Sequence, residues 1–473
     1  MHFIGLGGIG VSALAQVAQA RGARVSGSDS HVDLEANPAL ARLIAHGAEC
    51  HTGHRRSNVA EGVTRVVATA AVSGDNPEIV EARDRGIPVI SRAACLGELM
   101  AAHRGPTIAV GGTHGKSTTT AMLGVLLQGA GLDPTVFVGG EVAQLGGNVR
   151  IGSPDGPFVA EACEAYDSFL HLHPDVAIVT NVEADHLDHY GTEAGVFDGF
   201  LKFAEGVADG GSIVACADDE GARRLATMLP AGHRARVVTC GIDAPDADVA
   251  ARGLCLGARP RFELVDRRTG GAAEVQLGVP GRHNVENALA AAAAALLAGA
   301  SLDRIAAGLG AFRGTVRRQE RLGEIEAAGG RALVIDDYAH HPTEIRATLE
   351  AIRGAYPYRR LIAVFQPHLY SRTRDFLEEF GRSLSTADML VVTDVYAARE
   401  EPIPGVDSAA IVEAARRARP DLDATYIRDR HAIPSRVAGI ARAGDLILFL
   451  GAGDIREQAE ALVRLGAPAG AVL

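Results

Sequence analysis

Residues 107–118 read Thr-Ile-Ala-Val-Gly-Gly-Thr-His-Gly-Lys-Ser-Thr. The apolar run Thr107–Val110 predicts a short strand, and Met122, Val125 and Leu126 give the stretch that follows the apolar face of a helix. The N–H groups of a glycine-rich turn between a strand and a helix bind phosphate, helped by the partial positive charge at the helix start. We therefore predict an α/β nucleotide-binding domain built around this turn.

The side chains of the turn suit a nucleoside triphosphate. Lys116 has the length and charge to contact the β- and γ-phosphates, and the Ser117 hydroxyl is a ligand for Mg²⁺. The alternative is a glycine turn with a solvated lysine, which the flanking strand and helix make the weaker interpretation. The predicted ATP-binding residues of the turn are Gly112, Thr113, His114, Gly115, Lys116, Ser117 and Thr118.

Acidic residues and a histidine follow two further apolar runs. Glu161–Glu164 comes directly after Phe158–Ala160, and Asn181–His186 follows Val176–Thr180. Ligands of open α/β sheets bind at the carboxyl ends of the strands. We therefore expect both segments on the same rim as Lys116.

This rim is also the predicted place for metal ions. Mg²⁺ beside phosphates is held by one or two carboxylates, a hydroxyl and water. Glu164 with Ser117 predicts one Mg²⁺ site, and His186 a second. A histidine of the hydrophobic core is the alternative for His186, and its acidic, strand-end setting favours the metal.

The same pattern of short apolar runs, glycine turns and helical stretches continues through the chain, as is typical of parallel α/β sheets. With 473 residues, about three domains are expected. We predict domains at residues 1–104, 105–314 and 315–473, and helices over Val11–Ala20, from Asn284 to Ala298 and from Pro342. The predicted strands are His2–Leu6, Arg24–Gly27, Arg65–Ala71, Ile87–Ser91, Thr107–Val110, Phe158–Glu161, Val176–Asn181, Ser212–Cys216, Ala332–Ile335, Leu361–Phe365, Met389–Thr393, Ala424–Ile427 and Leu446–Leu450.

A second glycine-rich turn lies near the N-terminus. Residues 5–10 read Gly-Leu-Gly-Gly-Ile-Gly, and Asp29 follows about 20 residues on. This spacing fits a dinucleotide fingerprint, with the carboxylate on a ribose hydroxyl. A turn that binds another phosphate, or none, is the alternative.

Polar residues also end strands in the last third of the chain. Asp336–Pro342, Phe365–Arg374 and Gly451–Asp454 end predicted strands, so they would line one crevice. The alternative is that each is ordinary surface, which three segments in register make the weaker interpretation. Upstream, Gly281–Asn287 opens an alanine-rich helix. Asn284 suits a helix N-cap, and the alternative is that His283 and Asn287 meet a base edge.

Composition excludes several classes of protein. The formal charge of −12 argues against a general nucleic-acid binder, and no apolar run reaches the ~20 residues of a membrane span. Six scattered cysteines without a Cys-x-x-Cys pair, and no visible signal peptide, favour a cytoplasmic protein. A metal site at His46, Cys50, His51 and His54 matches no common zinc spacing.

Taken together, the motifs resemble those of the Mur ligase family, the ATP-dependent amide-forming enzymes of peptidoglycan precursor synthesis. The resemblance extends over essentially the whole chain and is closest to the branch that adds alanine. It implies a Rossmann-like N-terminal domain that binds a UDP-linked substrate, a central P-loop ATPase with a mixed, mostly parallel sheet, and a Rossmann-like C-terminal domain that closes over the amino acid. The matching segments are Gly112–Thr120, Glu161–Glu164, Asn181–His186, Gly281–Asn287 and Asp336–Pro342.

The resemblance also implies a reaction and a set of residue roles. L-alanine would be joined to the carboxylate of UDP-N-acetylmuramate through an acyl phosphate, with ATP as co-substrate and Mg²⁺ as cofactor, in a monomer or homodimer. The implied UDP-substrate contacts are Gly5, Gly7, Gly8, Gly10 and Asp29. Further implied ATP contacts are His283, Asn284, Asn287, Arg317, Arg318 and Asp336. The implied catalytic residues are Lys116, Glu164, His186, His340 and Arg372, the last two facing the alanine.

Some positions depart from the family pattern. Leu369 stands where arginine is frequent, Gln319 where an aromatic is frequent, and Ala70-Ala71 where two serines are frequent. Lys202 is near the spacing of a lysine that sister ligases carbamylate, and a solvated lysine is the better interpretation. The alternatives for function are a muropeptide-recycling ligase that adds a tripeptide, an oxidoreductase built on residues 5–10, and an inactive nucleotide-binding regulator.

Overall fold

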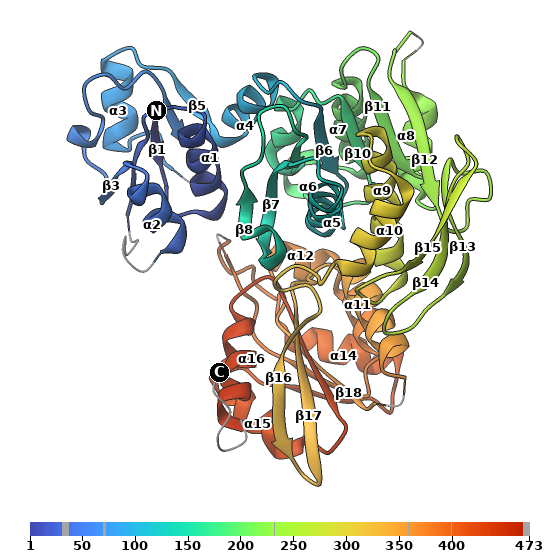
Figure 1. Ribbon diagram of the computed structural model, residues 1–473. Coiled ribbons are helices and arrows are strands. Elements are labelled where there is room, and N and C mark those ends of the chain that lie inside the picture. Colours follow the sequence, from blue (N-terminus) through green and yellow to red (C-terminus); the bar gives the residue numbers. More distant parts are fainter. Residues whose placement is uncertain (31–36, 70–71, 231, 358, 399, 467–473) are drawn as a thin grey trace. The chain divides into compact units, whose positions relative to one another are not determined.

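The computed structural model describes residues 1–30, 37–69, 72–230, 232–357, 359–398 and 400–466 (Figure 1). The chain forms two compact units. The first contains Met1–Gly253, Phe262–Val275 and Glu286–Phe312, and the second contains Leu254–Arg261, Gln276–Val285 and Arg313–Leu473. The departure at Ala70-Ala71 lies outside the described residues.

The N-terminal residues form a five-stranded parallel sheet in the order β3-β2-β1-β4-β5. A central first strand with later strands on both sides is the order of a Rossmann-like sheet. The strands are β1 (His2–Ile4), β2 (Ser26–Asp29), β3 (Glu49–Thr52), β4 (Val66–Ala68) and β5 (Val89–Ser91). The helices are α1 (Ile9–Ala20), α2 (Pro38–Ala45), η1 (Arg56–Asn58), α3 (Pro77–Asp84) and α4 (Arg92–Ala101).

The central sheet has ten strands in the order β15-β14-β13-β12-β11-β10-β6-β9-β7-β8. β6 lies between β10 and β9 and is parallel to both, so the carboxyl ends of these three strands share one rim. The strands are β6 (Thr107–Gly111), β7 (Thr135–Val142), β8 (Gly147–Arg150), β9 (Phe158–Glu161), β10 (Val176–Val179), β11 (Ser212–Cys216), β12 (Arg236–Gly241), β13 (Val249–Cys255), β14 (Arg261–Asp266) and β15 (Gly271–Gln276). The helices are α5 (Lys116–Gly129), η2 (Ala143–Leu145), η3 (Ala165–His171), α6 (Leu187–Tyr190), α7 (Glu193–Glu205), α8 (Glu220–Met228), α9 (Arg282–Leu297) and α10 (Leu302–Ala311).

The third sheet has six strands in the order β16-β17-β21-β18-β19-β20, and only β16 is antiparallel to its neighbour. Both of its faces are buried, because Leu333 and Ile335 join one hydrophobic cluster and Val334 joins another. The strands are β16 (Glu320–Ala327), β17 (Gly330–Asp337), β18 (Leu361–Phe365), β19 (Met389–Val392), β20 (Asp423–Tyr426) and β21 (Leu446–Leu450). The helices are α11 (Pro342–Ala355), α12 (Tyr370–Asp375), α13 (Leu377–Leu384), α14 (Ala409–Ala418), η4 (Arg430–Ala432), α15 (Ile433–Ile440) and α16 (Ile455–Gly466).

Most predicted strands are confirmed, and four of them have the predicted bounds: Phe158–Glu161, Ser212–Cys216, Leu361–Phe365 and Leu446–Leu450. The helix predicted to begin at Pro342 is also confirmed, with proline in its first turn. Among the described residues, no helix is long and apolar enough to cross a membrane.

Two local predictions are wrong. β2 runs over Ser26–Asp29 and not Arg24–Gly27, because its buried serines are satisfied by side chains, as in the 2.9 Å contact between Ser26 Oγ and His2 Nδ1. Asn284 does not cap α9, which begins at Arg282. Its amide instead donates to the Pro280 carbonyl at 2.7 Å.

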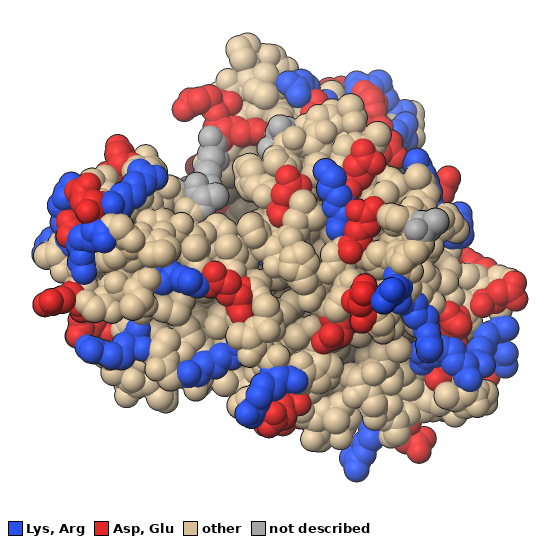
Figure 2. Space-filling model, turned by 90° about the horizontal axis from the view of Figure 1, so that it is seen from above, with Lys and Arg blue, Asp and Glu red and all other residues tan. Residues whose placement is uncertain are grey.

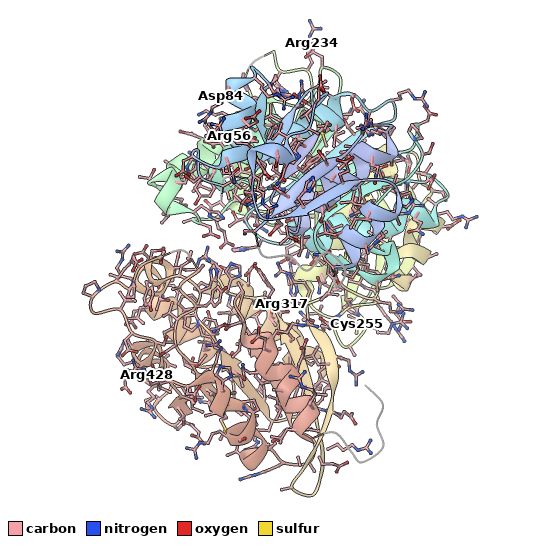
Figure 3. All side chains as sticks on the ribbon, turned by 90° about the vertical axis from the view of Figure 1, so that its left-hand side faces the viewer. Arg56, Asp84, Arg234, Cys255, Arg317 and Arg428 are labelled. Atoms are coloured by element: carbon pink, nitrogen blue, oxygen red, sulfur yellow. The ribbon has the colours of Figure 1, made fainter. Side chains whose placement is uncertain are left out.

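The charged side chains on the face in Figure 2 are interspersed, with blue and red groups side by side. Arg56 and Asp84 form one such exposed pair, 2.8 Å apart (Figure 3). Exposed pairs of this kind contribute little to stability. The polar contacts that matter more to the N-terminal sheet are buried.

Glu78 in α3 is a fully buried carboxylate. It accepts hydrogen bonds from Ser28 Oγ at 2.5 Å and Asn58 Nδ2 at 2.6 Å, and it lies 3.4 Å from both His2 Nε2 and His54 Nδ1. Burial raises the pKa of Glu78, but hydrogen bonds from His2, Ser28 and Asn58 outweigh it and lower the pKa to about 2. His54 thus belongs to a polar cluster that joins α3 to β1 and β2.

We expect Glu78→Gln to destabilise the protein by on the order of 3 kcal/mol near neutral pH. The pKa of Glu78 is lower in the folded state than its ordinary value of 4.5. Its stabilisation is therefore complete above that value and is lost as the pH falls toward 2. Urea unfolding at several pH values should show that the difference in the free energy of unfolding between variant and wild type becomes smaller in acid.

The matched control is Asp84→Asn on the same helix, where the carboxylate is exposed. Its effect should stay within about 0.5 kcal/mol. An equal difference in the free energy of unfolding between Glu78→Gln and wild type at about pH 7 and about pH 3 would contradict the lowered pKa of Glu78.

Candidate active site

The turn between β6 and α5 is held in a shape that only glycine tolerates at two positions. Gly112 has a φ of +136° and Gly115 a φ of +82°. A Cβ at Gly112 would collide with the Thr180 hydroxyl, and one at Gly115 would collide with the Asn287 amide. Side chains from the segment after β10 and from α9 therefore lie directly against the backbone of the turn.

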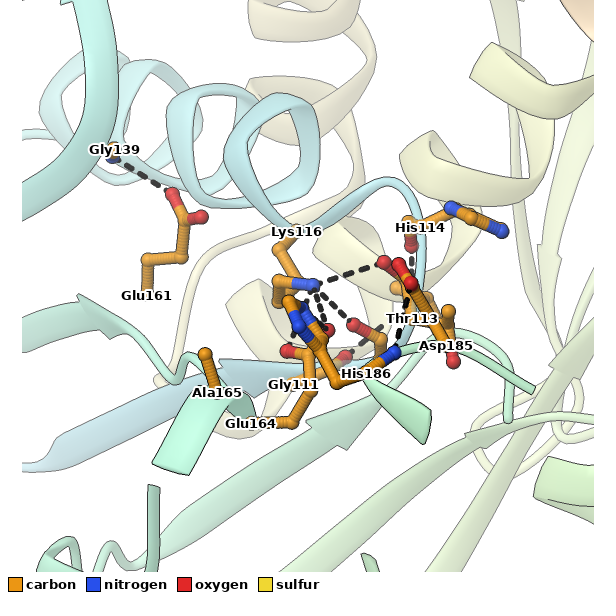
Figure 4. Close-up of polar contacts among 12 residues, drawn as sticks. Gly111, Thr113, His114, Lys116, Gly139, Glu161, Glu164, Ala165, Asp185 and His186 are labelled. Carbon is orange, nitrogen blue, oxygen red and sulfur yellow. Dashed lines mark hydrogen bonds and ion pairs between the residues drawn. The ribbon is translucent and has the colours of Figure 1, made fainter. Parts of the chain in front are cut away.

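Lys116 is held inside the turn (Figure 4). Its ammonium donates to the carbonyls of Gly112 at 2.6 Å and Thr113 at 2.9 Å, and to Glu164 Oε1 at 2.9 Å. Burial lowers the pKa of Lys116, but Glu164, Cys163 and Glu161 together raise it by more, so the net pKa lies above the ordinary value. The side chain is a fixed positive charge at the start of α5.

Ser117 contacts a different carboxylate from the one that the sequence predicts. Its hydroxyl donates to Glu161 Oε1 at 3.1 Å, and Glu161 Oε2 accepts from the Gly139 N–H at 2.7 Å. Glu164 faces Lys116 instead. The sequence analysis placed Glu161 on this rim but missed its role as the partner of Ser117, although the Glu-x-x-Glu motif that begins at the last residue of β9 contained the signal.

The segment after β10 braces the turn. Thr180 Oγ1 donates to the His114 carbonyl at 2.7 Å, while Asn181 Oδ1 accepts from the His114 N–H at 2.7 Å. β10 ends at Val179 and not at Asn181, because these two residues leave the sheet to bind the turn. The two strand ends and the turn thus form one hydrogen-bonded assembly.

His186 is partly exposed, with 32% of its side chain accessible, so it is not a core histidine. Its Nε2 lies 3.8 Å from Glu164 Oε1. The structure therefore brings together Lys116, Glu164 and His186, as the sequence analysis expected. This cluster combines an ammonium, carboxylate oxygens and an imidazole at a phosphate-binding turn, and it can hold both phosphates and a divalent cation.

The N-terminal turn has its own carboxylate contact. Gly5 N and Leu6 N donate to the Ser28 carbonyl, and Gly7 N donates to Asp29 Oδ2 at 2.9 Å. Gly10 packs against the side chain of Arg92. One oxygen of Asp29 therefore holds the turn itself, a role that the fingerprint interpretation did not include.

Asn287 and His283 lie on α9. Asn287 Oδ1 accepts from Thr119 Oγ1 at 3.2 Å within the first compact unit. In the second unit, His283 Nε2 is 3.4 Å from Gln319 Nε2. Burial, and to a smaller extent repulsion from the Arg318 charge, lowers the pKa of His283 to about 4. His283 is therefore neutral near pH 7.

Asp336 is the buried centre of an ion-pair network in the second unit. Arg456 lies 3.0 Å from it and Arg317 3.4 Å, and Arg456 also pairs with Glu320 at 2.6 Å. Arg317, labelled in Figure 3, donates to the Gly451 carbonyl at 2.7 Å. Arg456 is a second residue that the sequence analysis missed, since it lies in an ordinary amphipathic helix.

The residues after β17 and β18 differ in burial. His340 Nδ1 is 3.2 Å from Glu344, and Arg318 is 3.7 Å from the same side chain. Arg372 is only 7% exposed. Arg374 is exposed and pairs with Asp375 at 2.7 Å, so Arg372 is the buried guanidinium of the segment.

Three family models match the chain in order. The Mur ligase family catalytic domain matches residues 1–104, the Mur ligase middle domain matches 110–295, and the Mur ligase glutamate ligase domain matches 317–453. The chain belongs to the Mur ligase family and has its three-domain α/β architecture. The resemblance found in the sequence is thereby confirmed.

Similar proteins with full-length matches bear the name of one particular ligase of this family. The UDP-N-acetylmuramate–L-alanine ligase of Mycolicibacterium smegmatis is 46% identical, with 96% of this chain and 92% of the relative covered. The ligase of that name from Streptomyces avermitilis is 44% identical, covering 96% and 95%. The solved UDP-N-acetylmuramate–alanine ligase of Thermotoga maritima has a TM-score of 0.78 at 29% identity, covering 98% of both chains.

The chain has two lysines, which makes the Lys116 environment measurable. We expect acetic anhydride to modify Lys202, which is exposed, at least about ten times faster than the largely buried and protonated Lys116. Glu164→Gln removes the charge that raises the pKa of Lys116, so Lys116 should then react faster while Lys202 is unchanged. Peptide mass spectrometry reads both sites, and equal rates for the two lysines in wild type would refute the ion pair.

Proposed function

We propose that this chain joins L-alanine to the carboxylate of UDP-N-acetylmuramate, using ATP and releasing ADP and phosphate. The observation that carries the proposal is the Lys116–Glu164 pair in the phosphate-binding turn of a chain that is 42–46% identical to ligases of that name over nearly its full length. The product would be a precursor of peptidoglycan.

The chemistry requires activation of a poor electrophile. A carboxylate oxygen of the sugar nucleotide attacks the γ-phosphorus, the bond to ADP breaks, and an acyl phosphate forms. The amine of alanine then attacks the acyl carbon, loses a proton, and phosphate leaves. Because the carboxylate and triphosphate repel each other, the fixed charge of Lys116 would contribute chiefly by electrostatics and positioning.

The donor set around Lys116 fits Mg²⁺. Ser117 offers a hydroxyl, Glu161 and Glu164 offer carboxylates, and His186 would serve a second ion. Both carboxylate oxygens of Glu164 lie 2.9 Å from the Lys116 ammonium, so Mg²⁺ would share this carboxylate with Lys116. Bound Mg²⁺ would add positive charge at the phosphate oxygens.

The other predicted roles belong to the same proposal. Gly5, Gly7, Gly8, Gly10 and Asp29 would bind the UDP-linked substrate. ATP would be bound by the turn Gly112–Thr118 together with His283, Asn284, Asn287, Arg317, Arg318 and Asp336. His340 and Arg372 would face the alanine. We also propose the domain bounds 1–104, 105–314 and 315–473, a cytoplasmic location, a monomer or homodimer, and no nucleic-acid or membrane partner.

The test is phosphate release with ATP, Mg²⁺ and UDP-N-acetylmuramate, adding each amino acid in turn. We expect turnover with L-alanine, less with glycine or serine, and little with leucine, because one methyl group gives only ~1–3 kcal/mol of discrimination. A murein tripeptide is the decisive competitor, since a structure named murein peptide ligase from Psychrobacter arcticus has a TM-score of 0.69 at 26% identity. Preference for the tripeptide would replace this proposal with the recycling reaction.

A second test concerns the alanine carboxylate. We expect Arg372→Lys to raise the KM for alanine by about tenfold, with a smaller change in the KM for ATP. Lysine keeps the positive charge but cannot form the bidentate hydrogen bonds that arginine makes to a carboxylate. Arg374→Lys, on the exposed side of the same helix, is the matched control and should leave both constants near wild type. If Arg372→Lys weakens ATP and spares alanine, the amino-acid pocket lies elsewhere.

A further inference from the structure

The segments that follow β9 and β10 are both bent into an unusual backbone conformation. Tyr166, Asp167 and His186 have φ values of 53°, 56° and 51°, in the left-handed region that residues with a Cβ rarely adopt. Such residues cost about 1–3 kcal/mol each and persist where the surroundings hold them.

Two side chains of α6 connect the two segments. Tyr190 donates its hydroxyl to the Glu164 carbonyl at 2.7 Å, and His189 Nε2 lies 3.0 Å from Asp167 Oδ2. The Glu164 carbonyl also accepts from the Asp167 N–H at 3.1 Å. The turn 164–167 is thus held from one side by its own backbone and from the other by α6.

Tyr190 packs directly against two glycines of α7. A Cβ at Gly199 would lie 2.9 Å from Tyr190 Cε1 and 3.3 Å from its hydroxyl oxygen. A Cβ at Gly195, one helical turn earlier, would collide with the Tyr190 carbonyl. A larger residue at Gly199 would displace the ring and with it the hydroxyl that reaches Glu164, and one at Gly195 would displace the Tyr190 backbone.

We propose that Tyr190 is a positioning residue for the reaction: its hydroxyl fixes the backbone of Glu164, so that the Glu164 carboxylate faces Lys116 and His186. The path runs from the glycines of α7 through the tyrosine ring to the Glu164 carbonyl, and then to the carboxylate 2.9 Å from the ammonium. The proposal rests on the proposed function for its kinetic consequence. Its effect on the geometry of Glu164 is independent of the substrate.

The experiment compares Tyr190→Phe with Tyr166→Phe. The first change removes the hydroxyl that donates to the Glu164 carbonyl and that also faces the Asp167 carboxylate. The second removes a neighbouring, largely exposed hydroxyl for which no hydrogen bond is found among the described residues. Mn²⁺ binding to the full-length protein with ADP, followed by electron paramagnetic resonance, and hydrogen exchange of the peptide around Glu164 give two readouts that do not depend on turnover.

We expect Tyr190→Phe to weaken Mn²⁺ binding about fivefold, the effect of one lost hydrogen bond, and to speed exchange in residues 163–168. In turnover, kcat should fall by a similar factor while the KM for alanine changes less than about twofold. Tyr166→Phe should match wild type in all of these measurements. Gly199→Ala, which keeps the hydroxyl but displaces the ring, should reproduce the weaker Mn²⁺ binding and faster exchange.

Wild-type Mn²⁺ affinity and exchange in Tyr190→Phe would overturn the inference. If the wild-type protein shows no turnover with alanine, the proposed function fails, while the Mn²⁺ and exchange measurements still decide the role of Tyr190. If Tyr190→Phe changes the melting temperature alone, the hydroxyl is structural and the inference also fails.

Discussion

The hydrogen bonds of the Lys116 ammonium to the turn and to Glu164 are the interactions on which the rest of the first unit depends. Three acceptors surround the ammonium, two from the turn and one from Glu164. A buried ammonium without such partners would be strongly disfavoured. The turn can therefore hold its cation only if β9 delivers a carboxylate to the same place, and the adjacency of β6 and β9 in the sheet provides it.

Much of the fold could be predicted because apolar strands with polar neighbours carry a strong local signal. Phe158–Glu161 and Leu361–Phe365 are buried runs bounded by turns, and their bounds agree with the structure. β2 could not be placed correctly, since Ser-Gly-Ser-Asp has no apolar pattern and its burial depends on partners such as Glu78, 50 residues away. β16 was missed because its alternation is interrupted by the bulge near Gly323.

The site was predictable to the extent that each residue belongs to a local motif. Lys116, Glu164 and His186 come from such motifs, and the parallel order of three strands brings them together. The pairing within the cluster was not predictable. Ser117 meets Glu161, which ends β9 and also accepts from the Gly139 N–H of β7, and sequence spacing does not reveal this long-range contact.

The division of the chain into two units has a consequence for dissecting the protein. The backbone passes from one unit to the other at Gly253, Arg261, Val275, Val285 and Phe312, and the fourth passage falls inside α9. No single cut separates the units, and a fragment ending at Phe312 would retain Leu254–Arg261 and Gln276–Val285 without the rest of their unit. A shortened version cut at any one of these passages would therefore leave at least one unit without part of its chain. The N-terminal sheet is not a separable piece either, because its buried residues join the same hydrophobic cluster as Ala109 and Phe158 of the central sheet.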